Sequence, residues 1–190
     1  MNVATVLISR AECFARKRHA TQIRKGEAKE PYITHVEEVA RLTEKWGGTE
    51  EAICAAWLHD TVEDCPPTSF EELSDRFSET ISNLVRELTD DKSLPKAERK
   101  RLQILNANHK SEMASLIKIA DMTSNFRSIA GSPPANWSYV RRIEYLDWGT
   151  HVVEALPYKN DQAMSTFEEA RGVAKERAES DLEVGHVLQS

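Results

Sequence analysis

One short segment combines an imidazole with three carboxylates at spacings that could hold a metal. The segment runs Trp57-Leu-His-Asp-Thr-Val-Glu-Asp64, and if it ends a helix that begins near Glu50, all four side chains fall on one face. Carboxylates beside an apolar run are costly to bury unless a cation compensates them, so the pattern favours a divalent metal. A solvated surface pair is the alternative interpretation. The four residues are His59, Asp60, Glu63 and Asp64.

Two more distant residues could complete such a site. His35 lies at the start of a predicted helix, and Asp121 lies within a predicted helix from Ala114 to Arg127. With His59 and Asp60 they make a set of two imidazoles and two carboxylates, which suits manganese, iron or zinc. An ordinary hydrogen-bonding histidine and an ion-paired aspartate are the alternatives. The helix from Ala114 also carries a polar stripe in apolar surroundings, formed by Lys118, Asp121, Asn125 and Ser128.

Composition limits the class of protein and its partners. The 190 residues suit one domain, and the net charge of −6 argues against nucleic acid as the main partner. Local basic clusters, such as Arg24-Lys25 and the group around Lys96 and Arg99, could still serve a compact anion. The three cysteines suggest no disulfide framework, and no segment is long and apolar enough to span a bilayer. We therefore expect a cytoplasmic protein without a membrane partner.

The elements that must position these residues are predicted to be helices throughout. Gly and Pro number only 7 each and lie mostly between segments, and no stretch alternates with period two. Thr34 is the expected N-cap of the helix that contains His35, and Asn136 is the expected N-cap of a helix over residues 137–156. We predict an all-α fold with one main domain over residues 1–160. Residues 161–190 should form a C-terminal helix and tail packed on that domain.

The residues together resemble a known family. His35, His59-Asp60 and Asp121 reproduce the H…HD…D signature of the HD superfamily of metal-dependent phosphohydrolases. Three further segments are similar to the hydrolase domain of the RelA/SpoT alarmone enzymes, above all to the stand-alone small alarmone hydrolases. They are Pro31-Tyr-Ile-Thr-His35, Thr89-Asp-Asp-Lys92 and Ile117-Lys-Ile-Ala-Asp121. The likeness covers roughly residues 5 to 156, and it implies an HD-type bundle of roughly eight to ten helices.

The resemblance implies an activity and a role for each site residue. The reaction would be hydrolysis of guanosine 3′-diphosphate 5′-(di or tri)phosphate, (p)ppGpp, with pyrophosphate leaving the ribose 3′ position. His35, His59, Asp60 and Asp121 would bind one Mn²⁺, and Glu63 and Asp64 would orient and deprotonate the attacking water. Substrate binding would fall to Arg24, Lys25, Asn125, Lys118 and Arg141. The chain ends too early for the synthetase domain of the long enzymes, so we expect degradation only.

Two departures from the family pattern affect the predicted substrate. Met122-Thr-Ser124 stands where the family has a basic residue, Leu and an aromatic residue or His, and Val36 stands where Pro is usual. The first departure alters the wall near the nucleoside, so an adenosine alarmone or a phosphorylated dinucleotide is an alternative substrate. A non-catalytic alarmone-binding module is a third interpretation, which the intact ligand set and Glu63-Asp64 pair disfavour. A homodimer is compatible with the sequence.

Overall fold

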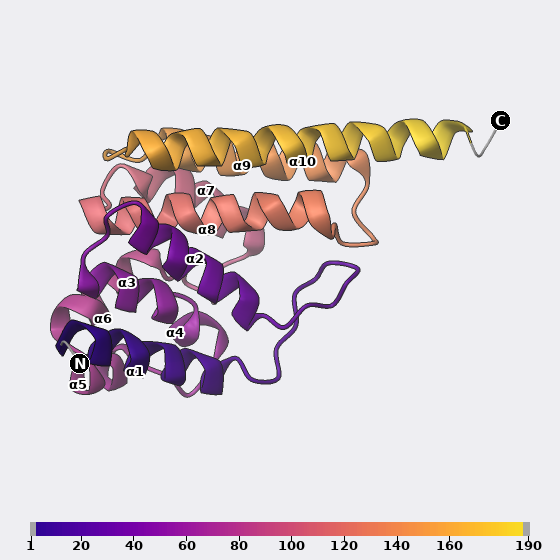
Figure 1. Ribbon diagram of the computed structural model, residues 1–190. Helices are drawn as coiled ribbons and strands as arrows, with labels where there is room; N and C mark the ends of the chain where they lie inside the picture. Colours follow the sequence, from indigo (N-terminus) through magenta and orange to yellow (C-terminus); the bar gives the residue numbers. More distant parts are fainter. Residues whose placement is uncertain (1–2, 188–190) are drawn as a thin grey trace.

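The predicted helices form a layered bundle in the computed structural model, which describes residues 3–187 (Figure 1). Within those residues ten helices form, and the remaining regular pairing is one isolated bridge between Ile23 and Pro31. The all-α prediction is confirmed. The helices are α1 (Val3–Arg18), α2 (Ile33–Lys45), α3 (Glu50–Leu58), α4 (Thr61–Asp64), α5 (Phe70–Arg76), α6 (Glu79–Leu88), α7 (Lys96–Ala107), α8 (Glu112–Gly131), α9 (Tyr139–Glu154) and α10 (Asp161–Val187).

Helix α8 is the element around which the others pack. It contacts α2 and α3 on one side and α9 and α10 on the other, so it lies between two layers of helices (Figure 1). Its side chains are buried almost without interruption from Ala114 to Phe126. A helix that is buried on all sides can carry polar residues only where these find partners. The polar stripe of α8 must therefore face other functional groups.

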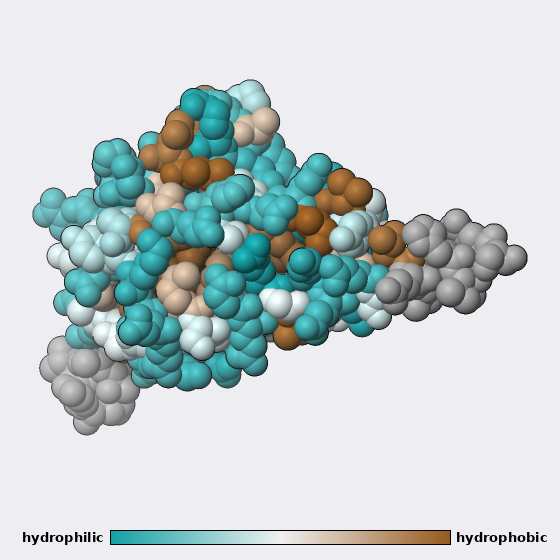
Figure 2. Space-filling model, turned by 90° about the horizontal axis from the view of Figure 1, so that it is seen from above, coloured by the Kyte–Doolittle hydropathy of each residue, from teal (hydrophilic) through white to brown (hydrophobic). Residues whose placement is uncertain are grey.

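Helix α10 runs along α8 and α9 and covers their outer side (Figure 1). The alanines of α10 at positions 163, 170, 174 and 178 are buried, and their small side chains let α10 approach α8 closely. Phe167 is fully buried and lies 5.1 Å from Phe126 of α8, measured between ring centroids. Seen from above, hydrophilic side chains cover most of this face, with apolar patches between them (Figure 2). Residues 188–190 of the predicted C-terminal segment lie outside the described part, and the division at residue 160 stays a prediction.

The predicted continuous helix from Glu50 to Asp64 is wrong, because the chain breaks between α3 and α4. Side chains in the connection bind the last carbonyl groups of α3: a ring nitrogen of His59 lies 2.7 Å from Ala56 O, and Thr61 Oγ1 donates to Leu58 O at 2.7 Å. These bonds satisfy carbonyls that have no partner at a helix end. His59 and Asp60 therefore lie in a turn, and Glu63 and Asp64 lie in the separate short helix α4.

Two predicted helix starts are also corrected. Helix α2 begins at Ile33, before Thr34, and the Thr34 hydroxyl donates to Pro31 O at 2.8 Å. Helix α9 is capped by Ser138, two residues beyond the predicted Asn136, and the Ser138 hydroxyl accepts a first-turn N–H. Both differences are of one or two residues, which is the usual uncertainty of a helix boundary. Neither change moves a site residue out of its helix.

The loop before α2 is attached to the end of α8. Arg24 N donates to Glu30 O at 2.8 Å, and Ala28 N donates to Ser132 Oγ at 2.8 Å. Gly26 lies so close to the Ser132 backbone that a Cβ atom there would collide with it. The loop therefore has a defined position beside α8. Among residues 3–187, none of the helices is both long and apolar enough to cross a membrane.

Candidate metal centre and nucleotide cleft

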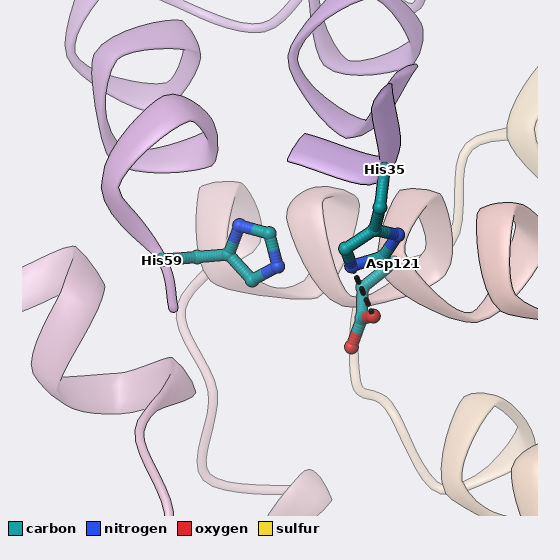
Figure 3. A group of neighbouring side chains, drawn as sticks. All are labelled: His35, His59 and Asp121. Atoms are coloured by element: carbon teal, nitrogen blue, oxygen red, sulfur yellow. Dashed lines mark ion pairs between the residues drawn. The ribbon is translucent and has the colours of Figure 1, made fainter. Parts of the chain in front are cut away.

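Three side chains from separate elements converge on one buried point (Figure 3). His35 comes from the first turn of α2, His59 from the turn after α3, and Asp121 from the middle of α8. Their candidate ligand atoms all lie within 4.8 Å of one another, and His35 Nε2 lies 3.5 Å from Asp121 Oδ1. Two imidazoles and a carboxylate at such distances make a site for a divalent transition metal.

Asp60, the fourth predicted ligand, faces the same point. Its Oδ2 atom lies 3.1 Å from His59 Nε2 and 3.7 Å from His35 Nε2. The same oxygen accepts a hydrogen bond of 2.5 Å from the Tyr32 hydroxyl. Sequence reasoning missed this role of Tyr32, although its place three residues before His35 was a usable signal. The four predicted ligands are thus brought together, and their role as ligands stays a proposal.

The two histidines of the centre have pKa values shifted in opposite directions. Burial and the charge of Arg24 lower the pKa of His35 to about 3. Burial also opposes protonation of His59, but the Asp60 carboxylate outweighs it and raises the pKa to about 9. The buried Nε2 atom of His59 has no aligned hydrogen-bond partner among the described residues. A metal ion would satisfy that atom and compensate the two aspartates, so the residues fit a bound cation.

Asp121 is held from both sides by its own helix. Lys118 Nζ donates to Oδ2 at 2.9 Å, and Asn125 Nδ2 donates to Oδ1 at 2.7 Å. Burial opposes ionisation of Asp121, but the Lys118 charge outweighs it and lowers the pKa of the carboxyl group. Lys118 is only 6 % exposed, so its ammonium is engaged with Asp121 in this structure. The predicted contact of Lys118 with substrate stays a prediction.

Glu63 and Asp64 lie on α4 at the edge of the metal centre. Glu63 Oε2 accepts from Asp90 N at 3.1 Å, which orients the carboxylate, and burial raises the pKa of Glu63. Lys92 forms ion pairs with both carboxylates, and Arg99 lies 3.8 Å from Glu63 Oε1. Sequence reasoning did not assign Lys92 to the site, although Lys92 belongs to the segment Thr89-Asp-Asp-Lys92, which resembles the family. A carboxylate with a raised pKa beside a metal centre suits a general base.

A cleft of about 660 Å³ opens beside these carboxylates. Cations line it on several sides, and Tyr32, Tyr145 and Trp148 add aromatic surface. A cleft of this kind suits a ligand that carries several phosphates and a planar base. The cationic lining residues are Lys25, Lys92, Lys96, Arg99 and Lys100.

The two predicted substrate residues of the loop point to different sides. Lys25 is exposed and lines this cleft, whereas Arg24 lines a neighbouring cavity of about 500 Å³. The Arg24 guanidinium donates to Asn125 Oδ1 at 3.1 Å and to Ser124 Oγ at 3.4 Å. Arg24 and Asn125 are thus brought together beside the metal centre. Their contacts with substrate stay predictions.

Comparison with known proteins decides the family. A family model described as an HD domain matches residues 11–144. The chain belongs to the HD-domain family. A guanosine-3′,5′-bis(diphosphate) 3′-pyrophosphohydrolase named MESH1 from Xenopus tropicalis is 46% identical over 158 residues, which cover 82% of this chain and 88% of that protein. The human MESH1 is 44% identical over 151 residues, covering 78% and 84%.

A solved structure shows the same fold. It belongs to a metazoan orthologue of SpoT that hydrolyses ppGpp, and it matches this HD-domain protein with a TM-score of 0.82 at 38% sequence identity. The match covers 86% of this chain and 93% of that one. The resemblance to the small alarmone hydrolases is therefore confirmed, as is the HD-type helical bundle.

Arg141 occupies a more peripheral place than predicted. Its side chain is exposed, and its guanidinium lies over the Trp137 ring at 4.9 Å from the centroid. Burial, and after it the charge of Arg141, lowers the pKa of Lys96, so the two cations lie near each other. Arg141 is not among the residues that line the cleft in this structure. We retain its contact with substrate as a prediction for the bound state.

Proposed function

We propose that this HD-domain protein hydrolyses (p)ppGpp at the ribose 3′ position, giving GDP or GTP and pyrophosphate. The observation that carries the proposal is the buried His35–His59–Asp121 centre with the Glu63–Asp64 pair at its edge, in a chain similar to curated (p)ppGpp hydrolases. The chain is thus an enzyme of nucleotide metabolism, and its partner is a small-molecule nucleotide.

The cofactor we propose is one Mn²⁺ per chain, held by His35, His59, Asp60 and Asp121. A bound divalent ion lowers the pKa of a coordinated water and neutralises charge on phosphoryl oxygens. Lys118 and Asn125 keep Asp121 ionised and in place, and Tyr32 orients Asp60. Nitrogen and carboxylate donors in equal number suit manganese, iron and zinc, and the metal content of the purified protein distinguishes among them.

The chain supplies the remaining steps of the reaction. Glu63, whose pKa is raised by burial, takes the proton of the attacking water, and Asp64 lies beside it on α4. The oxygen of that water bonds to the phosphorus attached to the ribose 3′ oxygen, as the bond between that phosphorus and the 3′ oxygen breaks. The 3′ oxygen takes up a proton and stays on the nucleotide as a hydroxyl, and pyrophosphate is released. We assign phosphate binding to Lys25, Lys92, Lys96 and Arg99, because they line the cleft. We assign nucleoside binding to Arg24 and Asn125, which are hydrogen-bonded to each other beside the metal centre.

A nucleotide panel tests the proposal. The protein with Mn²⁺ is incubated with ppGpp, pppGpp, their adenosine counterparts and GDP, and the products are separated by anion exchange. We expect equimolar GDP or GTP and pyrophosphate from the guanosine alarmones, and none from an Asp121→Asn variant. Turnover of the adenosine compounds alone would favour the alternative substrate, because Ser124 alters the wall beside Arg24. Binding without turnover would favour the non-catalytic module.

Assembly and location remain predictions. The expected homodimer is tested by light scattering of the purified protein, and the expected cytoplasmic location by fractionation of cells.

A further inference from the structure

The general base proposed for this enzyme is held by a residue outside its own helix. Glu63 Oε2 accepts from the backbone N–H of Asp90 at 3.1 Å. Asp90 follows Thr89, the C-cap of α6, whose own N–H donates to Val85 O at 3.0 Å. Because Asp90 lies beyond this last bond of the helix, its N–H must find a partner elsewhere. The place of the Glu63 carboxylate therefore depends on how the peptide group before Asp90 is oriented.

The side chain of Asp90 is tied to a second helix. Gln103 Nε2, on α7, donates to Asp90 Oδ2 at 2.6 Å. A carboxylate accepts hydrogen bonds, and the NH2 group of an amide donates them, so the direction of this bond is fixed. Helix α7 is in turn attached to α9, since Trp148 Nε1 donates to Lys100 O at 3.0 Å. Gln103 thus links the loop after α6 to a packed part of the bundle.

The other oxygen of Glu63 faces two cations. Lys92 Nζ lies 3.5 Å from Oε1, and Arg99 NH1 lies 3.8 Å from it. Both cations line the cleft, and in the proposed reaction they bind the phosphates, which compete with Glu63 for them. The hydrogen bond from Asp90 N does not depend on a group that the phosphates recruit. It is therefore the contact that can keep the Glu63 carboxylate in place while substrate is bound.

We propose that Asp90 and Gln103 are positioning residues that hold the Glu63 carboxylate for proton transfer. Gln103 fixes the Asp90 side chain, and the Asp90 N–H fixes the carboxylate. The inference rests on the proposed function and extends it to two residues that the predicted site did not contain. Both residues also line the cleft, so direct contact with substrate is the alternative that the experiments must separate. A displacement of about 1 Å in a catalytic group can lower a rate about 100-fold, which sets the scale of the effect.

The first test is the kinetics of Gln103→Met, which keeps the length of the side chain and removes its donor. We expect kcat for ppGpp to fall about 10–100-fold, while KM and metal content stay those of the wild type. Asn106→Met is the matched control, because Asn106 lies one turn further along α7, is exposed and is not among the residues that line the cleft. An unchanged kcat, a rise in KM alone, or an equal loss in the control would overturn the proposal.

A double-mutant cycle tests whether Gln103 acts through Glu63. In a Glu63→Gln background the base is already absent, so the addition of Gln103→Met should lower kcat by less than about twofold. A further loss as large as that in the wild-type background would show that Gln103 acts on another group, and it would refute the shared path.

Substitutions of Asp90 separate its hydrogen bond from its charge. Asp90 Oδ2 also lies 4.0 Å from Arg99 NH1, so an effect of the charge on that cation is a second route. Asp90→Asn keeps an oxygen that accepts from Gln103 and should retain most of the wild-type kcat, whereas Asp90→Ala should lose as much as Gln103→Met. Equal losses in both variants would overturn the proposal. Asp90 lies in a loop with its side chain 18% exposed, so these variants should fold even if Gln103→Met does not.

The hydrogen bond itself is observable without metal or substrate. Amide hydrogen exchange followed by NMR should show the Asp90 N–H protected in the wild type, and exchanging at least about tenfold faster in Gln103→Met and Asp90→Ala. An unprotected N–H in the wild type, or unchanged exchange in both variants, would overturn the proposal. Wild-type protein with this protection, lost in the variants, that leaves (p)ppGpp intact in the presence of Mn²⁺ would contradict the proposed function alone.

Discussion

Lys118 and Asp121 form a buried ion pair of 2.9 Å within one helix, at the centre of the molecule. The lysine side chain is 8% exposed and the aspartate side chain 11%. The carboxylate also faces His35 and Asp60, so the lysine offsets negative charge that would otherwise accumulate there. The pair links the stability of α8 to the charge state of the metal centre.

Removal of this lysine should destabilise the metal-free protein. Lys118→Met leaves Asp121 buried without its cation, and breaking a buried pair in this way costs about 3–5 kcal/mol of unfolding free energy. Added Mn²⁺ should restore part of the loss, because it compensates the same carboxylate. Urea unfolding followed by circular dichroism measures both effects. Lys175→Met on the exposed face of α10 is the control and should change the free energy by less than about 0.5 kcal/mol.

The metal content should depend on Asp121. Asp121→Asn keeps the size of the side chain and removes its charge, so the purified variant should lose the Mn, Fe or Zn that we expect at close to one ion per wild-type chain. Elemental analysis after gel filtration measures the ratio. Asp147→Asn, on the exposed side of α9, should retain the metal. Full occupancy of Asp121→Asn would remove this residue from the ligand set.

Metal binding should release a proton from His59. Its pKa of about 9 leaves the ring protonated at pH 7, whereas a ligand imidazole must be neutral. His35, with a pKa of about 3, is already neutral. Binding at pH 7 should therefore release about one proton per ion, and affinity should rise about tenfold per pH unit up to pH 9. Calorimetric titration with Mn²⁺ in buffers of different ionisation enthalpy measures the proton release. Binding without proton release at pH 7 would contradict the assignment of His59 as a ligand.

Glu63 should affect turnover without affecting the metal. Glu63→Gln keeps the hydrogen bond from Asp90 N and removes the base, so kcat should fall about 10²–10⁴-fold. Metal content and substrate affinity should remain those of the wild type. Glu98→Gln, on the exposed surface of α7, is the control. A wild-type kcat in metal-loaded Glu63→Gln would assign proton transfer to another group.

The loop cations should determine substrate affinity. Lys25→Ala removes an exposed charge from the cleft, so KM for ppGpp should rise more than tenfold, or about 1.4 kcal/mol, with metal content unchanged. Arg24→Ala should raise KM similarly, but it also removes a donor from Ser124 and Asn125. High salt should weaken the wild type more than either variant. Lys45→Ala, at the far end of α2, is the control, and an unchanged KM in both variants would shift the phosphate contacts to Lys96 and Arg99.

The sequence alone determined what depends on local pattern. Helical periodicity and the absence of two-residue alternation led to the all-α fold, and the ligand residue types led to a divalent metal. His59 and Asp60 are neighbours in the chain, so their proximity needed no tertiary information. His35 and Asp121 could be added from the sequence only as candidates and through the family resemblance, because neither lies near His59 along the chain.

The tertiary structure decided which groups meet. Helical spacing indicates the face on which a side chain lies, but not the helix that packs against that face. The contacts of Tyr32 with Asp60, Lys92 with Asp64, and Ser124 with His35 therefore arise only when α2, α8 and the segments that follow α3 and α6 are packed together. The break after Leu58 has a local origin, since side-chain bonds from His59 and Thr61 to the last carbonyls of α3 compete with continuation of the helix. Propensity describes one residue in its own segment, whereas the contacts between segments are set by hydrogen bonds and burial across the whole bundle.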